Sequence, residues 1–162
     1  NKLIKRHPHV FKNGKEKISF NKKSWEKNKQ ISKNRASILD GTPISLPSII
    51  KSQRLQEKAS SVGFDWDNIN DVWPKLYEEI DELKIACEKG QLKSIEEEIG
   101  DCFFSLVNLA RHLNISAENS VRKTNNKFSK RFKEVELKVS KMNKKINEMS
   151  NEEISILWES VK

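Results

Sequence analysis

Two acidic clusters separated by a predicted turn limit how this chain can fold. The first cluster is residues 78–82 (EEIDE), the second is residues 96–101 (EEEIGD), and Gly90 lies between them. Glycine commonly ends a helix because it adopts the left-handed conformation without strain. Two helices that fold back on each other at Gly90 would therefore bring the two clusters together.

Four carboxylates in these clusters are spaced to share one site. Glu79 and Glu82 are three residues apart, as are Glu98 and Asp101, and such pairs project from neighbouring positions on a helix. Four unpaired carboxylates would repel one another and partly protonate. The arrangement therefore predicts a hard divalent cation among them, Mg²⁺, for which Mn²⁺ can substitute. A metal held in this way indicates phosphate chemistry.

Apolar residues recur at helical spacing beside both acidic pairs. Further helices are predicted from Pro47 to the region of Gly63, from Ser116 onward, and over residues 152–161. Because no alternating strand pattern of useful length occurs, the sequence predicts an all-α fold, an antiparallel helical bundle. The two apolar stripes are Val72, Leu76, Ile80, Leu83 and Cys87, and Ile95, Ile99, Phe103, Leu106, Ala110 and Leu113.

The formal net charge of +8 is unevenly distributed along the 162 residues. Residues 1–35 and 122–145 are basic, whereas residues 78–101 are acidic. An acidic island between basic flanks suits a metal with a bound polyphosphate, although a lysine-rich composition also simply solvates a surface. Two cysteines in apolar stretches, no apolar signal stretch and no run of membrane-spanning length predict a cytoplasmic protein with reduced thiols and no membrane partner.

Two cations in the predicted long helix are spaced to hold the phosphates of a substrate. Lys127 and Arg131 are four residues apart and flank the aromatic stripe of that helix. Arg binds phosphate oxygens through a bidentate fork and Lys binds them as a point charge. Lys75, one turn before Glu79, can join them. The alternative is that Lys127 and Arg131 form surface pairs with nearby acids such as Glu134.

The metal-binding carboxylates are also the predicted catalytic residues. One that is not fully used as a ligand can orient or deprotonate water for attack on phosphorus. Trp158 offers a flat surface for stacking on a nucleobase, although a Trp in a terminal helix is more often a packing residue. The absence of a Glu-x-x-His motif argues against a ferritin-like di-iron bundle. The predicted catalytic set is Glu79, Glu82, Glu98 and Asp101.

These motifs together resemble the MazG family of all-α nucleoside triphosphate pyrophosphohydrolases. The resemblance covers residues 46–162 and implies that they form the family's C-terminal catalytic domain. Residues 1–45 would then be a basic appendage or linker, in which residues 6–11 (RHPHVF) resemble the end of a lost or truncated N-terminal MazG domain. The matching segments are residues 55–66 (LQEKASSVGFDW), 78–83 (EEIDEL), 96–101 (EEEIGD), 106–111 (LVNLAR) and 126–132 (NKFSKRF).

The resemblance also implies a reaction and a set of site residues. Members of the family hydrolyse nucleoside triphosphates to nucleoside monophosphate and pyrophosphate with Mg²⁺, and they are typically homodimers with the site at or near the subunit interface. By resemblance, the metal ligands are Glu79, Glu82, Glu98 and Asp101, and the substrate-binding residues are Lys75, Lys127, Arg131 and Trp158.

Two alternatives to this function remain open. Related all-α pyrophosphohydrolases act on a narrower substrate, dUTP or phosphoribosyl-ATP. The other alternative is a non-catalytic basic module that binds nucleic acid or another partner, with the carboxylates as surface charge. The acidic clusters argue against nucleic acid as a partner, because they repel phosphate unless a metal intervenes.

Overall fold

The computed structural model describes residues 36–162, which form two compact units. The first unit ends at Ala117 and the second is Glu118–Lys162, and each is described by itself. The basic segment 1–35 lies outside the described residues, so the boundary expected between residues 45 and 46 stays a prediction.

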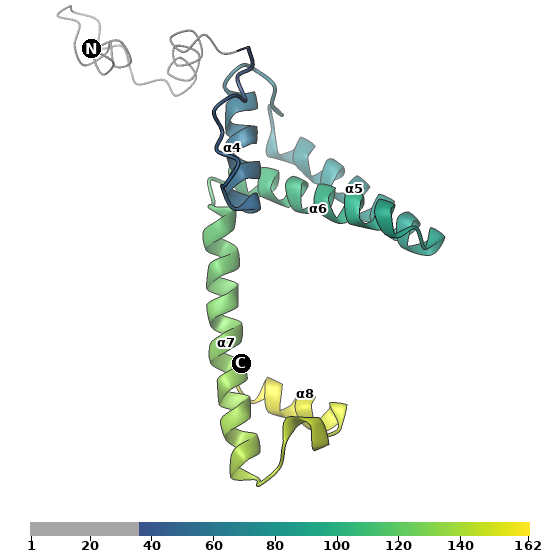
Figure 1. Cartoon of the computed structure of the whole chain (residues 1–162), viewed down its shortest axis with the longest axis vertical. Helices are drawn as coiled ribbons and strands as arrows, with labels where there is room; N and C mark the ends of the chain where they lie inside the picture. Colours follow the sequence, from purple (N-terminus) through teal and green to yellow (C-terminus); the bar gives the residue numbers. More distant parts are fainter. Residues whose placement is uncertain (1–35) are drawn as a thin grey trace, which may run out of the picture. The chain divides into compact units, whose positions relative to one another are not determined.

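The first unit contains three described helices (Figure 1). They are α4 (Ser48–Ser60), α5 (Ile69–Lys89) and α6 (Leu92–His112). The Asn68 side chain caps α5 by accepting a hydrogen bond from the backbone N–H of Asn70 at 2.9 Å. Gly90 ends α5 in the left-handed conformation, with φ of 67°. The chain therefore reverses at Gly90, and α6 packs back along α5.

A small apolar core and a buried lysine hold the first unit together. Val72 and Leu76 of α5 pack against Leu109 of α6, and α4 packs on α6 as well. Lys58 of α4 is only 1% exposed, and its ammonium donates hydrogen bonds to the carbonyls of Ile38 at 3.1 Å and Asp40 at 2.8 Å. These bonds attach the segment before α4 to the unit.

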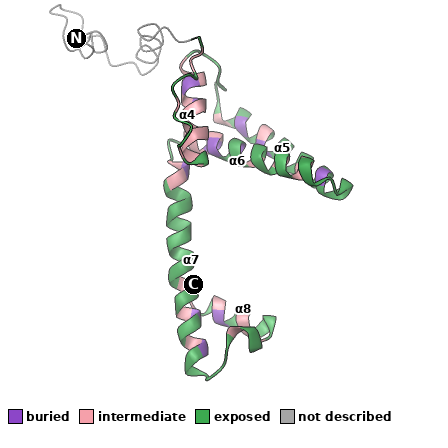
Figure 2. Ribbon diagram, in the orientation of Figure 1, coloured by how far each residue is buried: buried purple, intermediate pink, exposed green. Residues whose placement is uncertain are grey.

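Much of the predicted apolar stripe on α6 is solvent-exposed in this unit (Figure 2). Ile99, Phe103 and Leu106 are 42%, 56% and 48% exposed, so they form no part of the first unit's core. A helix in a two-helix hairpin buries only the residues that face its partner, which leaves the rest of a wide stripe uncovered. The periodicity predicted the helix correctly, but the core it implied was too large.

The second unit is a long helix with a short return segment, α7 (Ala117–Lys141), the 3₁₀-helix η1 (Ile146–Glu148) and α8 (Asn151–Glu159). Its core consists of Val135, Val139 and Leu157. Across residues 36–162 the structure contains helices and no strand, which confirms the all-α prediction. In the same range no helix combines the length and the apolar character needed to span a membrane.

Candidate functional site

Three of the predicted carboxylates come together in the first unit. Glu79 of α5 and Glu98 and Asp101 of α6 each offer one oxygen, and these oxygens all lie within 4.8 Å of one another. The hairpin explains the meeting, because Glu79 precedes Gly90 by the same number of residues by which Asp101 follows it. Glu79 is only 6% exposed, so its charge is held away from bulk water. Three convergent hard oxygens fit a divalent cation such as Mg²⁺.

Glu82, the fourth predicted ligand, lies outside this group of three. It still acts on the group, because the pKa of Glu98 is raised first by desolvation and then by the charges of Glu82, Asp101 and Glu79. A raised carboxyl pKa means that the charged form is disfavoured by its surroundings. A cation bound among these residues would remove that repulsion. The charge repulsion and the positions of the carboxylate oxygens therefore both suit a cation at Glu79, Glu98 and Asp101.

Lys75 places a permanent positive charge beside the carboxylates. Its ammonium lies 2.8 Å from an oxygen of Glu79 and 3.0 Å from an oxygen of Glu78. The hydrogen bond with Glu79, followed by that with Glu78, raises the pKa of Lys75, so the side chain stays charged. The structure thus brings Lys75 to the predicted site.

A cavity of about 710 Å³ adjoins these residues within the first unit. Lys75, Glu79 and Asp101 contribute charged groups to one part of its wall, and α4, α6 and the loop between α4 and α5 contribute both polar and apolar side chains, several of them aromatic. Its volume falls in the range of small-molecule sites. The remaining lining residues are Leu39, Leu55, Gln56, Ala59, Gly63, Phe64, Asp65, Trp66, Phe104, Ser105, Asn108 and Arg111.

One face of α6 forms a wall of this cavity. Its lining residues Asp101, Phe104, Asn108 and Arg111 recur at helical spacing and therefore share a face. A helix rises by about 1.5 Å per residue, so Asp101 and Arg111 are roughly 15 Å apart along the axis. The cavity wall thus runs from an acidic end at Asp101 to a second polar group at Arg111.

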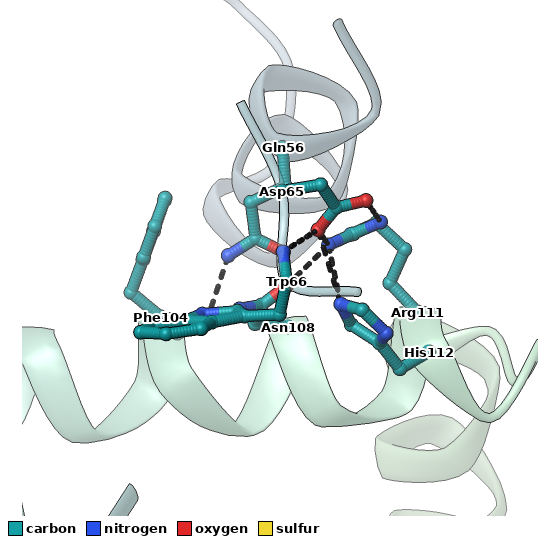
Figure 3. A network of polar contacts seen from close by, with 7 residues as sticks. All are labelled: Gln56, Asp65, Trp66, Phe104, Asn108, Arg111 and His112. Atoms are coloured by element: carbon teal, nitrogen blue, oxygen red, sulfur yellow. Dashed lines mark hydrogen bonds and ion pairs between the residues drawn. The ribbon is translucent and has the colours of Figure 1, made fainter. Parts of the chain in front are cut away.

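That second polar group is a network around Asp65, shown in Figure 3. Arg111 donates two hydrogen bonds to the Asp65 carboxylate, at 2.8 and 2.5 Å. The imidazole Nε2 of His112 lies 3.1 Å from the same carboxylate. Burial raises the pKa of Asp65, but hydrogen bonds from Arg111 and Ser60 and the charges of Arg111 and His112 outweigh it and hold the pKa well below its usual range. The network fixes the loop between α4 and α5 to the end of α6.

The remaining predicted residues belong to the second unit. Arg131 donates a hydrogen bond at 3.0 Å to the backbone carbonyl of Lys162. The rings of Phe128 and Trp158 are 5.4 Å apart, and Trp158 also packs on the core of that unit. Trp158 therefore packs within its own unit, as a Trp in a terminal helix commonly does. Its contact with a nucleotide, and the phosphate contacts of Lys127 and Arg131, stay predictions.

Sequence reasoning assigned no role to Gln56, Asp65 or Arg111. Asp65 and Arg111 are 46 residues apart in the chain. Helical periodicity relates residues within one helix and gives no signal for a contact between a loop and a distant helix end. The available signal was that all three residues lie in segments that resemble the MazG family, residues 55–66 and 106–111.

Comparisons with known proteins agree with these motifs. Residues 68–136 match the family model of the MazG nucleotide pyrophosphohydrolase domain. The chain is 39% identical over 167 residues to the nucleoside triphosphate pyrophosphohydrolase of Escherichia coli (strain K12), a match that covers 99% of this chain and 64% of that protein. The predicted resemblance to the MazG family is thereby confirmed.

Two further relatives show a match of similar extent. The nucleoside triphosphate pyrophosphohydrolase/pyrophosphatase MazG of Thermotoga maritima is 39% identical over 163 residues, covering 99% of this chain and 62% of that protein. YabN of Bacillus subtilis, an uncharacterized protein, is 37% identical over 165 residues, covering 99% of this chain and 34% of its own length. The chain thus spans less than two thirds of the length of these relatives.

Proposed function

We propose that this chain, which carries a MazG domain at residues 68–136, hydrolyses nucleoside triphosphates to nucleoside monophosphate and pyrophosphate. The observation that carries the proposal is the meeting of Glu79, Glu98 and Asp101 within 4.8 Å beside a cavity of substrate size. The names of the Escherichia coli and Thermotoga maritima relatives support the reaction.

In this proposal Glu79, Glu98 and Asp101 hold Mg²⁺, or Mn²⁺ in its place, and Glu82 is the further ligand expected from the sequence. When bound, the metal polarises phosphoryl oxygens and lowers the pKa of bound water. A carboxylate oxygen that is not used as a ligand accepts a proton from the attacking water. Lys75 stays charged through its pairs with Glu79 and Glu78 and supplies a cation to the non-bridging phosphate oxygens.

Lys127, Arg131 and Trp158, which belong to the second unit, are proposed to bind the substrate. Lys127 and Arg131 are four residues apart on α7. They provide a point charge and a bidentate fork of hydrogen-bond donors for the phosphate oxygens. Trp158 would contact the nucleoside, in addition to its packing against Phe128. These roles come from the family resemblance.

A homodimer is part of the same proposal. The exposed apolar residues of α6, among them Ile99, Phe103 and Leu106, form a surface that suits association. A second copy of the chain would bury this surface. A cytoplasmic location is also proposed, since the free thiols of Cys87 and Cys102 suit a reducing compartment.

The test is analysis of the products by phosphorus NMR. The chain is incubated with the common ribo- and deoxyribonucleoside triphosphates and with dUTP, with and without Mg²⁺. Monophosphate and pyrophosphate that form only with metal would support the proposal, and the relative rates would separate a general enzyme from one restricted to dUTP. Orthophosphate with diphosphate, or an absence of metal-dependent turnover in the folded protein, would contradict it.

A further inference from the structure

Gln56 is a buried polar residue in the cavity wall with half of its amide unused. The side chain is 7% exposed, and its Nε2 donates a hydrogen bond at 2.9 Å to the carbonyl of Phe104. Its Oε1 is buried and has no hydrogen-bond partner. The amide cannot simply turn over, because Oε1 would then face the Phe104 carbonyl, which is also an acceptor. The contact with Phe104 thus fixes Oε1 as an unused acceptor.

Arg111 carries a complementary unused donor in the same wall. Its terminal nitrogens bind Asp65, but its buried Nε–H has no hydrogen-bond partner. Among the side chains of residues 36–162, Gln56 Oε1 and Arg111 Nε are the buried polar atoms left in this state. Both residues line the 710 Å³ cavity and belong to the group in Figure 3. Buried polar atoms are normally satisfied, so two orphans of opposite type in one cavity indicate a ligand with a donor and an acceptor.

The rest of this part of the wall suits a flat, mostly apolar ring. Phe64, Trp66 and Phe104 contribute aromatic side chains, and Leu55 and Ala59 of α4 add apolar surface. Aromatic side chains bind bases by stacking. A nucleobase combines such a ring with an edge on which an N–H donor stands beside an acceptor. The acidic end of the same cavity is where the phosphates of that molecule would lie.

We propose that Gln56 Oε1 and Arg111 Nε recognise the edge of the substrate's nucleobase, with Gln56 accepting a hydrogen bond from a base N–H. The inference rests on the proposed function, since it assigns the nucleobase of that substrate to this cavity. Arg111 donates to the neighbouring acceptor on the base. Gln56 is then a specificity-determining residue, because a base that lacks the N–H leaves Oε1 buried and unpaired.

The first arm of the test uses the unchanged protein and modified substrates. We compare kcat/KM for the best triphosphate with that for its analogue in which the base N–H is replaced by N-methyl, and with its 2′-deoxy and 3′-deoxy forms. Loss of a hydrogen bond to a buried group is expected to lower kcat/KM by about 10- to 100-fold for the N-methyl analogue. Equal values for the parent and the N-methyl analogue, or a loss confined to the sugar-modified forms, would overturn the proposal.

The second arm separates the hydrogen bond from the bulk of the methyl group. Gln56→Met keeps a side chain of similar length but removes the Oε1 acceptor, together with the hydrogen bond to Phe104, so it should lose activity on the parent and no longer distinguish the N-methyl analogue. Gln53→Met, three residues earlier on α4 and outside this cavity, is the matched control and should behave as the unchanged protein. A folded Gln56→Met variant that discriminates as well as the unchanged protein would overturn the proposal.

Calorimetric titration with nucleoside monophosphates distinguishes failure of the inference from failure of the proposed function. If no triphosphate is hydrolysed, the proposed function fails. Binding of the monophosphates that is weakened by base N-methylation and by Gln56→Met would still support the cavity assignment. Absence of binding, or binding that neither change affects, would overturn it. If Gln56→Met does not fold, as judged by circular dichroism, the comparison of analogues in the unchanged protein decides alone.

Discussion

The two ends of the cavity are built in different ways. At the acidic end, Glu79 and Asp101 are brought together by one helical hairpin closed at Gly90. At the other end, the loop that carries Phe64 and Trp66 is held to α6 by the ion pair between Asp65 and Arg111. Regular helices thus position the charges, whereas a tertiary ion pair positions the aromatic side chains of the loop. Substitutions at the acidic end should therefore change turnover, whereas substitutions at the other end should change base selectivity or stability.

Glu98→Gln should have the largest effect. It removes a charged oxygen from the group that is proposed to hold the metal, so turnover should fall by at least about 100-fold, as when a single stabilising group is lost from an active site. The ranking of bases should not change, because Glu98 does not line the aromatic part of the cavity. Steady-state pyrophosphate release with several triphosphates measures both quantities.

Glu97→Gln is the matched control for this variant. Glu97 is the preceding residue on α6, is exposed and lies outside the group of three carboxylates. It should retain turnover within about 2-fold, since an exposed charge interacts weakly. Equal losses in the two variants would show that general negative charge on α6, and no specific metal group, supports activity.

Lys75→Met should have the next largest effect. It removes the cation beside Glu79 while keeping much of the aliphatic side chain. Because charge-assisted hydrogen bonds to phosphate are strong, we expect kcat/KM to fall by about 10- to 100-fold. Saturation kinetics with a nucleoside triphosphate measure this loss. Unchanged kinetics would mean that Lys75 forms ion pairs with Glu78 and Glu79 but does not bind the substrate.

Arg131→Met tests the proposed contact of Arg131 with the phosphates of the substrate. If the half-buried Arg131 binds a substrate phosphate as proposed, its loss should raise KM by about 10-fold, with base selectivity unchanged. Lys130→Met, which removes the exposed neighbouring charge on α7, should leave KM near the original value. A KM that both variants raise equally would indicate a diffuse effect of positive charge.

Asp65→Asn should have the smallest effect on turnover and a clear effect on stability. Arg111 would lose its ionised partner, which at this partly exposed site corresponds to about 1–2 kcal/mol of unfolding free energy. Because the pKa of Asp65 is lowered by folding, its contribution is present above its ordinary pKa and is lost as pH falls through the lowered value. Urea unfolding at neutral pH and below about pH 4 measures both the free energy of unfolding and its dependence on pH.

The pH dependence gives this prediction its control. The unchanged protein should lose stability faster than Asp65→Asn as the pH falls below the ordinary aspartate pKa. Parallel pH profiles would mean that the ion pair with Arg111 adds nothing to the free energy of unfolding.

The same contrast explains what could be predicted from the sequence. The meeting of Glu79, Glu98 and Asp101 is predictable because spacing along a helix and a glycine turn are local properties. The cavity was not found, because Gln56 and Arg111 acquire their environment only through packing between distant segments. The exposure of Phe103 shows the same limit, since periodicity predicts an apolar face but not what covers it.

Titration of Mn²⁺ followed by electron paramagnetic resonance, with Mg²⁺ as competitor, tests the metal centre most directly. The unchanged protein and Glu97→Gln should bind Mn²⁺ alike, and Mg²⁺ should displace it. Glu98→Gln should weaken Mn²⁺ binding by about 10-fold or more, as expected when a ligand oxygen is lost. Equal binding by all three proteins, or no binding to the unchanged protein, would contradict the claim that Glu79, Glu98 and Asp101 form a metal centre.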